Sequence, residues 1–429
     1  LHLLHTAHQC LEAQHVIITV ALNPALDQTV EVERFEHAVD LWTVVLEISV
    51  AMASYPTKAI AERSWSHRPL GLGYANLGAL LMRQGLAYDS RKGRTLAAAL
   101  TAILTGEAYW VSALLAQQQG AFAAFDENRE PMLKVIQKHD SYADLLYETD
   151  PNYLTNQAQV SWNHAYAAGR EFGYRNSQIS VIAPTGTISF VMDCDTTGIE
   201  PDFSLVKYKD LAGGGSMSIV NQSVAPGLRA LNYTELEIES ILKHIEEKNS
   251  VVGAPAMREE DYAVFDCAMG ERSVSADGHL QMMAVCQPFL SGAISKTVNL
   301  PASASVEEVA NINYQAWKLG IKCVALYRDG CKMSQPLNTE NQEKPREVFK
   351  IDLSALDAEA ATKAARLRIT IDDGALDVQY GNRIARWRFM HGLAEHAEDG
   401  KGVAHIRCRC FGIQRRFVEF DTFAVTLSK

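Results

Sequence analysis

Apolar residues recur every three or four positions through most of this chain, which predicts amphipathic helices. Short β-branched runs separate these stretches and predict buried strands at 178–183, 293–298 and 322–327. Helices that alternate with short buried strands indicate an α/β fold that is rich in helix. The predicted helices cover residues 38–53, 77–85, 95–118, 156–172, 234–248 and 306–319.

The two ends of the chain have a different pattern. Residues 16–22 form an apolar, β-branched run that predicts a strand. In the tail, two similar runs at 367–371 and 376–380 flank Asp372-Asp373-Gly374 and predict a hairpin. We therefore expect four regions, which are an unassigned or foreign N-terminal segment 1–34, a main domain 35–338, a linker 339–347 and a β-rich tail 348–429.

One turn in the main domain is rich in hydrogen-bond donors. A short apolar strand stops at Pro184, and Gly186 would let the backbone come close to a ligand. If a helix begins near Ile188, free amides and the hydroxyls of Thr185, Thr187 and Ser189 converge on one spot, which suits a phosphate. A plain connection between a strand and a helix has the same pattern, so both interpretations stay open from the residues alone.

Composition narrows the class of protein. A chain of 429 residues can bury a large core and has room for two or three domains. The formal charge of −11 argues against nonspecific nucleic-acid binding. Eight scattered cysteines do not form a secreted disulfide framework, and the apolar run 41–52 is too short to span a bilayer. We expect a cytoplasmic enzyme without a membrane partner and, because it starts at Leu1, a fragment.

Several long sequence blocks occur in a fixed order between residues 35 and 338. Pro184-Thr185-Gly186-Thr187-Ile188 is the most characteristic of them. With these blocks the chain resembles the large, adenosylcobalamin-dependent (class II) ribonucleotide reductases. The other blocks are 41–50, 68–81, 195–201, 211–215, 221–224, 287–299, 325–330 and 334–338.

The resemblance implies a fold and a substrate. The family folds as a ten-stranded α/β barrel, and residues 35–338 are similar to its C-terminal part. By the same resemblance, the loop that grips the substrate diphosphate corresponds to Pro184, Thr185, Gly186, Thr187 and Ile188. The implied activity is the reduction of ribonucleotides to deoxyribonucleotides for DNA synthesis. A thiol reductant such as thioredoxin would be a partner, and a homodimer is compatible with the family.

The resemblance also implies a cofactor. Reductases that draw their radical from a separate subunit carry two adjacent tyrosines after the last barrel strand, whereas Tyr327 stands alone here. This difference favours adenosylcobalamin as the radical source. Its cobalt would be held by the corrin, so we expect no metal ligands from the protein.

The main departure from the family concerns catalysis. Family members carry a radical cysteine in an Asn-Pro-Cys-Gly-Glu block and a redox cysteine in a Cys-Asn-Leu segment, and neither occurs here. We therefore assign no catalytic residue and expect a partial or chimeric copy, or a catalytically inactive nucleotide-binding remnant. The remaining cysteines read as small buried apolar groups, namely Cys194, Cys267, Cys286, Cys323 and Cys331.

The N-terminal segment carries a second resemblance. Residues 16–30 resemble the opening of 1-phosphofructokinase-type sugar kinases, in which the position of Asp27 contacts the sugar. Such kinases also need a Gly-Ala-Gly-Asp block, which is absent. A sugar-phosphate kinase is therefore the third hypothesis, and the join near residue 34 indicates a fusion or an artefact.

Three weaker candidates complete the set. Lys296 could offset phosphate charge, although an exposed lysine without a role is commoner. Gly71, Gly73 and Gly78 lack the spacing of a dinucleotide site and are better explained by tight packing. The tail sequence His405-Ile406-Arg407-Cys408-Arg409-Cys410 could begin a zinc site, but a fourth ligand is not evident and two cysteines on one strand face explain it as well.

Overall fold

The computed structural model describes residues 28–210 and 216–331 and five strand segments of the tail. The chain divides into two compact units, 1–341 and 342–429, which we consider separately. The predicted strand 16–22 and the predicted linker 339–347 lie outside the described residues.

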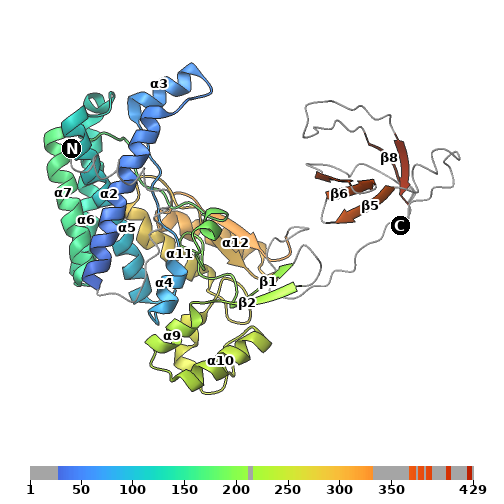
Figure 1. Cartoon of the computed structure of the whole chain (residues 1–429). Helices are drawn as coiled ribbons and strands as arrows, with labels where there is room; N and C mark the ends of the chain where they lie inside the picture. Colours follow the sequence, from blue (N-terminus) through green and yellow to red (C-terminus); the bar gives the residue numbers. More distant parts are fainter. Residues whose placement is uncertain are drawn as a thin grey trace. The chain divides into compact units, whose positions relative to one another are not determined.

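Four long helices lie side by side in the first unit (Figure 1). The longest of them approaches its neighbour closely at Gly106, where a Cβ atom would come within 3.0 Å of the Ser161 Cβ. This helix is apolar enough to cross a membrane by composition, but 89% of its most apolar stretch is buried inside the protein. It is therefore a core helix in this fold. The four are α2 (Gln28–Met52), α5 (Arg91–Gln119), α6 (Phe125–Thr149) and α7 (Tyr153–Phe172).

Local sequence explains where several helices begin. Asn152 and Thr155 form a capping box at the start of α7, in which each side chain accepts a hydrogen bond from the other residue's backbone amide. Thr234 does the same with Glu237 at the start of α10 (Glu235–Lys248). The start of α12 (Val306–Lys318) has an equivalent box. The predicted helices at 156–172, 234–248 and 306–319 are thus confirmed to within a few residues.

Short parallel strand segments run beside these helices. The Leu72 amide donates to the Ile179 carbonyl at 2.8 Å, and the Ile182 amide donates to the Ala293 carbonyl at 3.1 Å. Farther along, β3 (Thr297–Leu300) pairs with β4 (Ala325–Arg328), again in parallel. The strand predicted at 178–183 forms only isolated bridges, and the strands predicted at 293–298 and 322–327 begin later than expected. The order of segments is 70–72, 178–182, 292–300 and 325–328.

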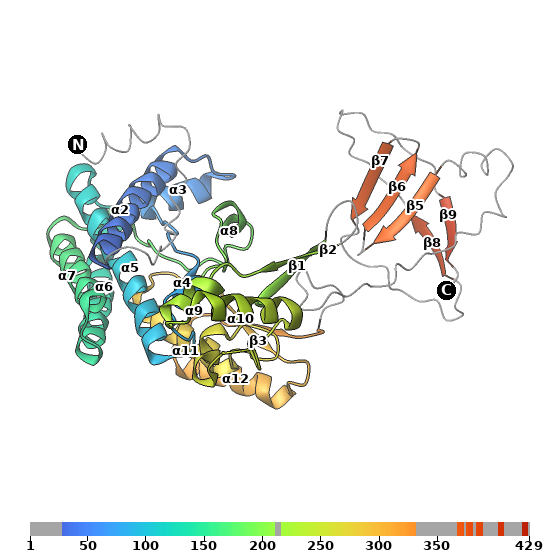
Figure 2. The same ribbon diagram turned by 60° about the horizontal axis from the view of Figure 1, so that its bottom comes forward.

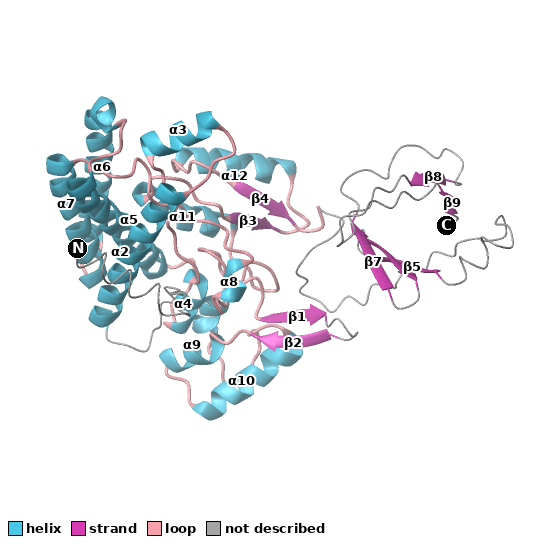
Figure 3. Ribbon diagram, turned by 45° about the horizontal axis from the view of Figure 1, so that its top comes forward, coloured by secondary structure: helices cyan, strands magenta, loops and turns pink. Residues whose placement is uncertain are grey.

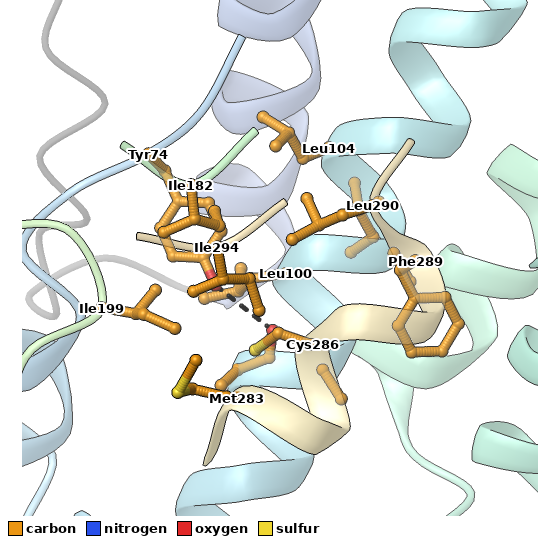
Figure 4. Close-up of a cluster of buried hydrophobic side chains, with 14 of the residues drawn as sticks. Tyr74, Leu100, Leu104, Ile182, Ile199, Met283, Cys286, Phe289, Leu290 and Ile294 are labelled. Carbon is orange, nitrogen blue, oxygen red and sulfur yellow. Dashed lines mark hydrogen bonds between the residues drawn. The ribbon is translucent and has the colours of Figure 1, made fainter. Parts of the chain in front are cut away.

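The main hydrophobic core lies between the strand segments and the helices. Figure 4 shows Ile182 and Ile294 of the strand segments facing Met283 and Cys286 of α11 (Ala276–Cys286). All four side chains are almost fully buried. Figure 3 shows β3 and β4 beside α11 and α12. This alternation of helices and short parallel strands confirms the helix-rich α/β class.

A second core lies under a smaller group of helices, visible in Figure 2 beside the β1–β2 hairpin. It contains Val206 at the start of β1 and the buried faces of the neighbouring helices. Its elements are α4 (Leu77–Arg83), α9 (Val224–Ala230), α10, the 3₁₀ helix η1 (Glu259–Phe265), β1 (Val206–Asp210) and β2 (Ser216–Val220). Three short elements complete the unit, namely α3 (Lys58–His67), α8 (Ile188–Val191) and the 3₁₀ helix η2 (Gln287–Phe289).

The second unit contains antiparallel strands. The predicted hairpin is confirmed, with Ile371 opposite Leu376 across the turn. Cys408 and Cys410, the thiols of the zinc hypothesis, lie outside the described residues. The strands are β5 (Leu367–Asp372), β6 (Ala375–Tyr380), β7 (Arg383–Arg388), β8 (Gly402–Ile406) and β9 (Phe423–Leu427).

Candidate functional site

The bend at residues 184–188 lies at the carboxyl end of a strand segment. Strand segment 178–182 has parallel neighbours on both sides, and the bend begins at the carboxyl edge of this segment, two residues after the pairing of Ile182 with Ile294. In open α/β sheets, this is the edge where ligands bind. Pro184, Gly186, Thr187 and Ile188 are exposed, and Thr185 is half-buried. The fold thus presents the bend at the surface.

Three successive amides of the bend have no internal partner. The backbone N–H groups of Gly186, Thr187 and Ile188 find no acceptor among the described residues. The next amide, that of Ser189, is used internally and donates to the Thr185 carbonyl at 2.9 Å. Because α8 is a single turn, the donors of the bend itself, rather than a helix dipole, are what a ligand would meet.

Thr185 holds an uncommon backbone conformation. Its φ is +51°, in the left-handed region that β-branched residues rarely occupy. Its Oγ1 accepts a hydrogen bond from the Gly198 amide at 2.7 Å and another from the Ser189 hydroxyl at 2.9 Å. Strained residues of this kind persist only where the surroundings hold them, and they cluster at functional sites. Here the holding contact comes from residues 196–200.

That segment is fixed in turn by the start of α4. The Asn76 Oδ1 accepts a hydrogen bond from the Thr196 amide at 3.1 Å, and the Thr196 Oγ1 accepts one from the Ala79 amide at 3.2 Å. The Tyr88 hydroxyl donates to the Ile199 carbonyl at 2.6 Å. Sequence blocks 68–81 and 195–201, which are far apart along the chain, therefore meet directly behind the bend.

A buried ion pair closes the same segment. The Lys296 Nζ donates to the Glu200 Oε2 at 2.7 Å, to the His279 Nδ1 at 2.7 Å and to the Thr297 carbonyl at 2.9 Å. The other Glu200 oxygen accepts the Thr297 amide at 2.7 Å. Because the Lys296 side chain is 0% exposed, it does not reach a ligand at the surface. The prediction that Lys296 is an exposed lysine is therefore wrong, because its side chain is buried in an ion pair with Glu200.

Burial also sets the protonation of this cluster. Desolvation lowers the pKa of Lys296, although Glu200 opposes the effect. Desolvation and then the charge of Lys296 lower the pKa of His279 to about 2. The imidazole is therefore neutral and accepts at Nδ1, while its Nε2 has no partner among the described residues. Three acceptors around Nζ match the three hydrogens of an ammonium group.

A further contact brings in block 221–224. The Ser223 hydroxyl donates to the carboxylate of Asp195, and the Arg83 Nε donates to the Ser223 hydroxyl at 3.0 Å. Nearby, the Asn221 side-chain amide donates to the Asp202 carboxylate. Residues 211–215, the triple-glycine block, lie outside the described residues.

The glycines of block 68–81 have packing roles. A Cβ atom at Gly73 would come within 2.3 Å of the Val181 carbonyl oxygen, and one at Gly78 within 2.4 Å of the Glu200 carbonyl oxygen. Both glycines let backbone segments touch at the base of the bend, as the packing interpretation predicts.

The described cysteines are free thiols in five separate places. Cys267 and Cys286 are buried as predicted, but Cys323 and Cys331 are exposed, so the prediction of small buried groups is wrong for these two. Only Cys194 lies beside the bend, where its amide donates to the Ser189 carbonyl at 3.0 Å. Desolvation by burial raises the pKa of its thiol, which keeps it protonated.

Comparison with known proteins identifies similar chains. The family described as "Ribonucleotide reductase, barrel domain" matches residues 8–327, a range that includes the segment resembling sugar kinases. A "Vitamin B12-dependent ribonucleotide reductase" of Streptomyces avermitilis is 47% identical over 343 residues, covering 80% of this chain and 36% of that protein. Proteins of the same name from Streptomyces coelicolor and Bradyrhizobium diazoefficiens are 49% and 40% identical, covering 74% and 72% of this chain. The chain thus spans about a third of the length of these relatives.

Proposed function

This chain belongs to the ribonucleotide reductase family through its barrel domain, and from that premise we propose that it serves the reduction of ribonucleotides to deoxyribonucleotides. Its described part would bind the diphosphate of the substrate at residues 184–188. The observation that carries this proposal is the exposed bend with three successive amides that have no acceptor in the part of the chain that the structure describes.

The proposed binding mode follows from the donors present. The amides of Gly186, Thr187 and Ile188 would donate to phosphoryl oxygens, and the exposed Thr187 hydroxyl would add a fourth donor. Hydrogen bonds to charged groups contribute about 1.5–3 kcal/mol each. Thr185 would act differently, because its hydroxyl already accepts two hydrogen bonds and holds the shape of the bend. Pro184 would end the strand at the point where the ligand sits.

The name of the relatives points to a cofactor. Because they are named vitamin B12-dependent, adenosylcobalamin is the proposed source of the radical. When bound, it would supply a carbon radical to start the chemistry. The described thiols do not fit the radical step, since Cys194 is the one of the five that hydrogen-bonds beside the bend, and Cys286, which faces Ile182, is buried in the core. The residues of this part would therefore bind and orient the substrate. A thiol reductant such as thioredoxin, a homodimer and a cytoplasmic location belong to the same proposal.

A second candidate function is nucleotide binding without turnover. Two observations favour it. The bend offers hydrogen-bond donors for a nucleotide, and the described cysteines do not form a cluster beside it that could carry out the reduction. The two candidates differ in a single assay, in which the purified chain is incubated with a ribonucleoside diphosphate, adenosylcobalamin and dithiothreitol. Deoxyribonucleotide product supports the reductase, and saturable binding without product supports the binding protein. Absence of both would contradict both.

A further inference from the structure

The polar cluster behind the bend is unusual because it is charged and almost fully enclosed. The Lys296 side chain is 0% exposed and that of Glu200 is 19% exposed. Burying such a pair costs desolvation free energy, which close and complete hydrogen bonding must offset. The pair satisfies this condition, since the three Nζ contacts and both Glu200 oxygens are used. The contacts of this pair with neighbouring segments therefore indicate which part of the fold it holds in place.

Contacts run from this pair to the bend in two steps. Glu200 ends the segment 196–200, and its carboxylate is held on both oxygens by residues of the neighbouring strand segment. Two residues before it, the Gly198 amide donates to the Thr185 Oγ1 at 2.7 Å. Gly198 has little room to move, because its φ is +46° and a Cβ atom there would come within 2.8 Å of the Ala183 carbonyl oxygen. The position of Glu200 therefore sets the position of the donor that holds Thr185.

The conformation of Thr185 decides where the free amides point. A residue with positive φ next to residues with negative φ turns successive N–H groups toward one concave side, which suits an anion. If Thr185 relaxed to the usual negative φ, the amides of Gly186, Thr187 and Ile188 would lose this common direction. The buried pair can therefore affect the shape of the bend without contacting the ligand.

We infer that Lys296 and Glu200 are positioning residues for the substrate diphosphate, which hold Thr185 in its left-handed conformation through Gly198 and so pre-form the anion-binding bend. Neither side chain would touch the ligand. This inference rests on the proposed function and deepens it, because it names the residues outside the bend that set its affinity.

The test compares pyrophosphate binding by calorimetry in the full chain and in Glu200→Gln/Lys296→Met. Replacing both charges leaves no unpaired buried charge, so the variant should fold, which urea unfolding would check. We expect the dissociation constant for pyrophosphate to rise about tenfold, as for the loss of one hydrogen bond to a charged group. If the double variant does not fold, Glu200→Asp replaces it, because the shorter carboxylate keeps the charge of Lys296 paired but cannot hold both Lys296 and the Thr297 amide in the same positions, and the same rise is expected. The control is Asp266→Asn/Arg272→Met, which removes a 2.6 Å ion pair elsewhere and should leave binding unchanged.

Repeating the test in a Thr185→Gly variant shows whether Lys296 and Glu200 position Thr185 or only stabilise the fold in general. Glycine tolerates a positive φ, so in a Thr185→Gly background the pair has no strained residue to hold. The same Glu200 and Lys296 substitutions should then change pyrophosphate affinity by less than about threefold. A smaller effect in this background than in the unsubstituted chain shows that the pair acts through Thr185, because the effects of independent residues would simply add. An equal loss in both backgrounds, or unchanged binding in the double variant, would overturn the inference alone. If the unsubstituted chain does not bind pyrophosphate, the proposed function is wrong and the inference falls with it.

Discussion

At the scale of single residues, Gly186 is the position where the bend has free space. A Cβ atom there would meet nothing within 4 Å, and its φ is not in the left-handed region. Alanine should therefore cost little stability. A ligand that approaches the amides closely would nevertheless meet the new methyl group.

We predict that Gly186→Ala weakens pyrophosphate binding about tenfold, roughly the loss of one charge-assisted hydrogen bond, and leaves the urea midpoint unchanged. Calorimetry and urea unfolding would measure the two quantities. Gly71→Ala is the matched control, because its Cβ atom would make an ordinary 3.4 Å contact with the Val181 side chain and would meet no atom of residues 184–188 within 4 Å. Equal affinities for Gly186→Ala and the unsubstituted chain would count against ligand contact at this residue.

A half-buried carboxyl group of α2, that of Asp40, lies beside the buried carboxyl group of Glu107 in α5. Desolvation is the main cause that raises the pKa of Asp40 and of Glu107, and the charge of Asp40 raises that of Glu107 further. Glu107 titrates at about 9 in the fold. A carboxyl group whose pKa is raised on folding contributes stability below its ordinary pKa, and this contribution is lost as the pH rises through the raised value.

The free energy of unfolding should therefore fall as the pH rises from about 5 to about 9, because in this range the unfolded state has released a proton that the folded state still holds. In the Glu107→Gln variant the side chain at this position does not ionise. We therefore predict that the free energy of unfolding depends less on pH and is greater at pH 9 than in the unsubstituted chain. Urea unfolding at pH 5, 7 and 9 measures this. Parallel pH profiles for the two proteins would show that Glu107 is not the group responsible.

Much of the bend could be predicted from its own residues, whereas its support could not. Pro184, Gly186 and the hydroxyls are visible as a donor-rich turn in the sequence. The roles of Gly198 and Glu200 depend on contacts with residues 13 and 96 positions away, which no local pattern encodes. The burial of Lys296 could not be predicted for the same reason, since the sequence does not show that a carboxylate, an imidazole and a carbonyl surround its ammonium group.

At the scale of elements, some helices lack a clear helical signal in the sequence, and α3, α6 and α11 are among them. α3 has no buried residue, so no apolar stripe marks it. α6 contains Pro131, which reads as a helix breaker, and α11 is apolar on most of its surface because it is buried on several sides. The segment 178–182 read as a full strand, but its two neighbours bond to it over only a few residues each.

The crossing of α5 and α7 gives a prediction at this scale. Gly106 lets the helices approach, since a Cβ atom there would lie 3.0 Å from the Ser161 Cβ and 3.1 Å from the Trp162 backbone nitrogen. Overpacking of this kind costs about 1–3 kcal/mol. We predict that Gly106→Ala lowers the free energy of unfolding by that amount, as measured with urea. Gly186→Ala, which introduces the same methyl group into open space, is the control, and equal stability of the two variants would contradict close packing at Gly106.

At the scale of the whole molecule, the fold gathers blocks that the sequence keeps apart. Residues of blocks 68–81, 195–201, 221–224 and 287–299 are joined by hydrogen bonds around or behind the bend. The order of the blocks is visible in the sequence, but their convergence depends on the parallel pairing of strand segments that lie far apart along the chain. This convergence is why a segment spanning a third of its relatives' length can hold a candidate binding site.

Three backbone amides of the bend are proposed to bind the substrate diphosphate. Hydrogen–deuterium exchange on the full chain, with and without a ribonucleoside diphosphate, reads these amides directly. Without ligand, Gly186, Thr187 and Ile188 should exchange rapidly, because they have no acceptor among the described residues. With saturating ligand, we predict slowed exchange at these three positions and no such slowing with the unphosphorylated nucleoside. Saturable binding of the diphosphate that leaves exchange at residues 186–188 unchanged would contradict the account.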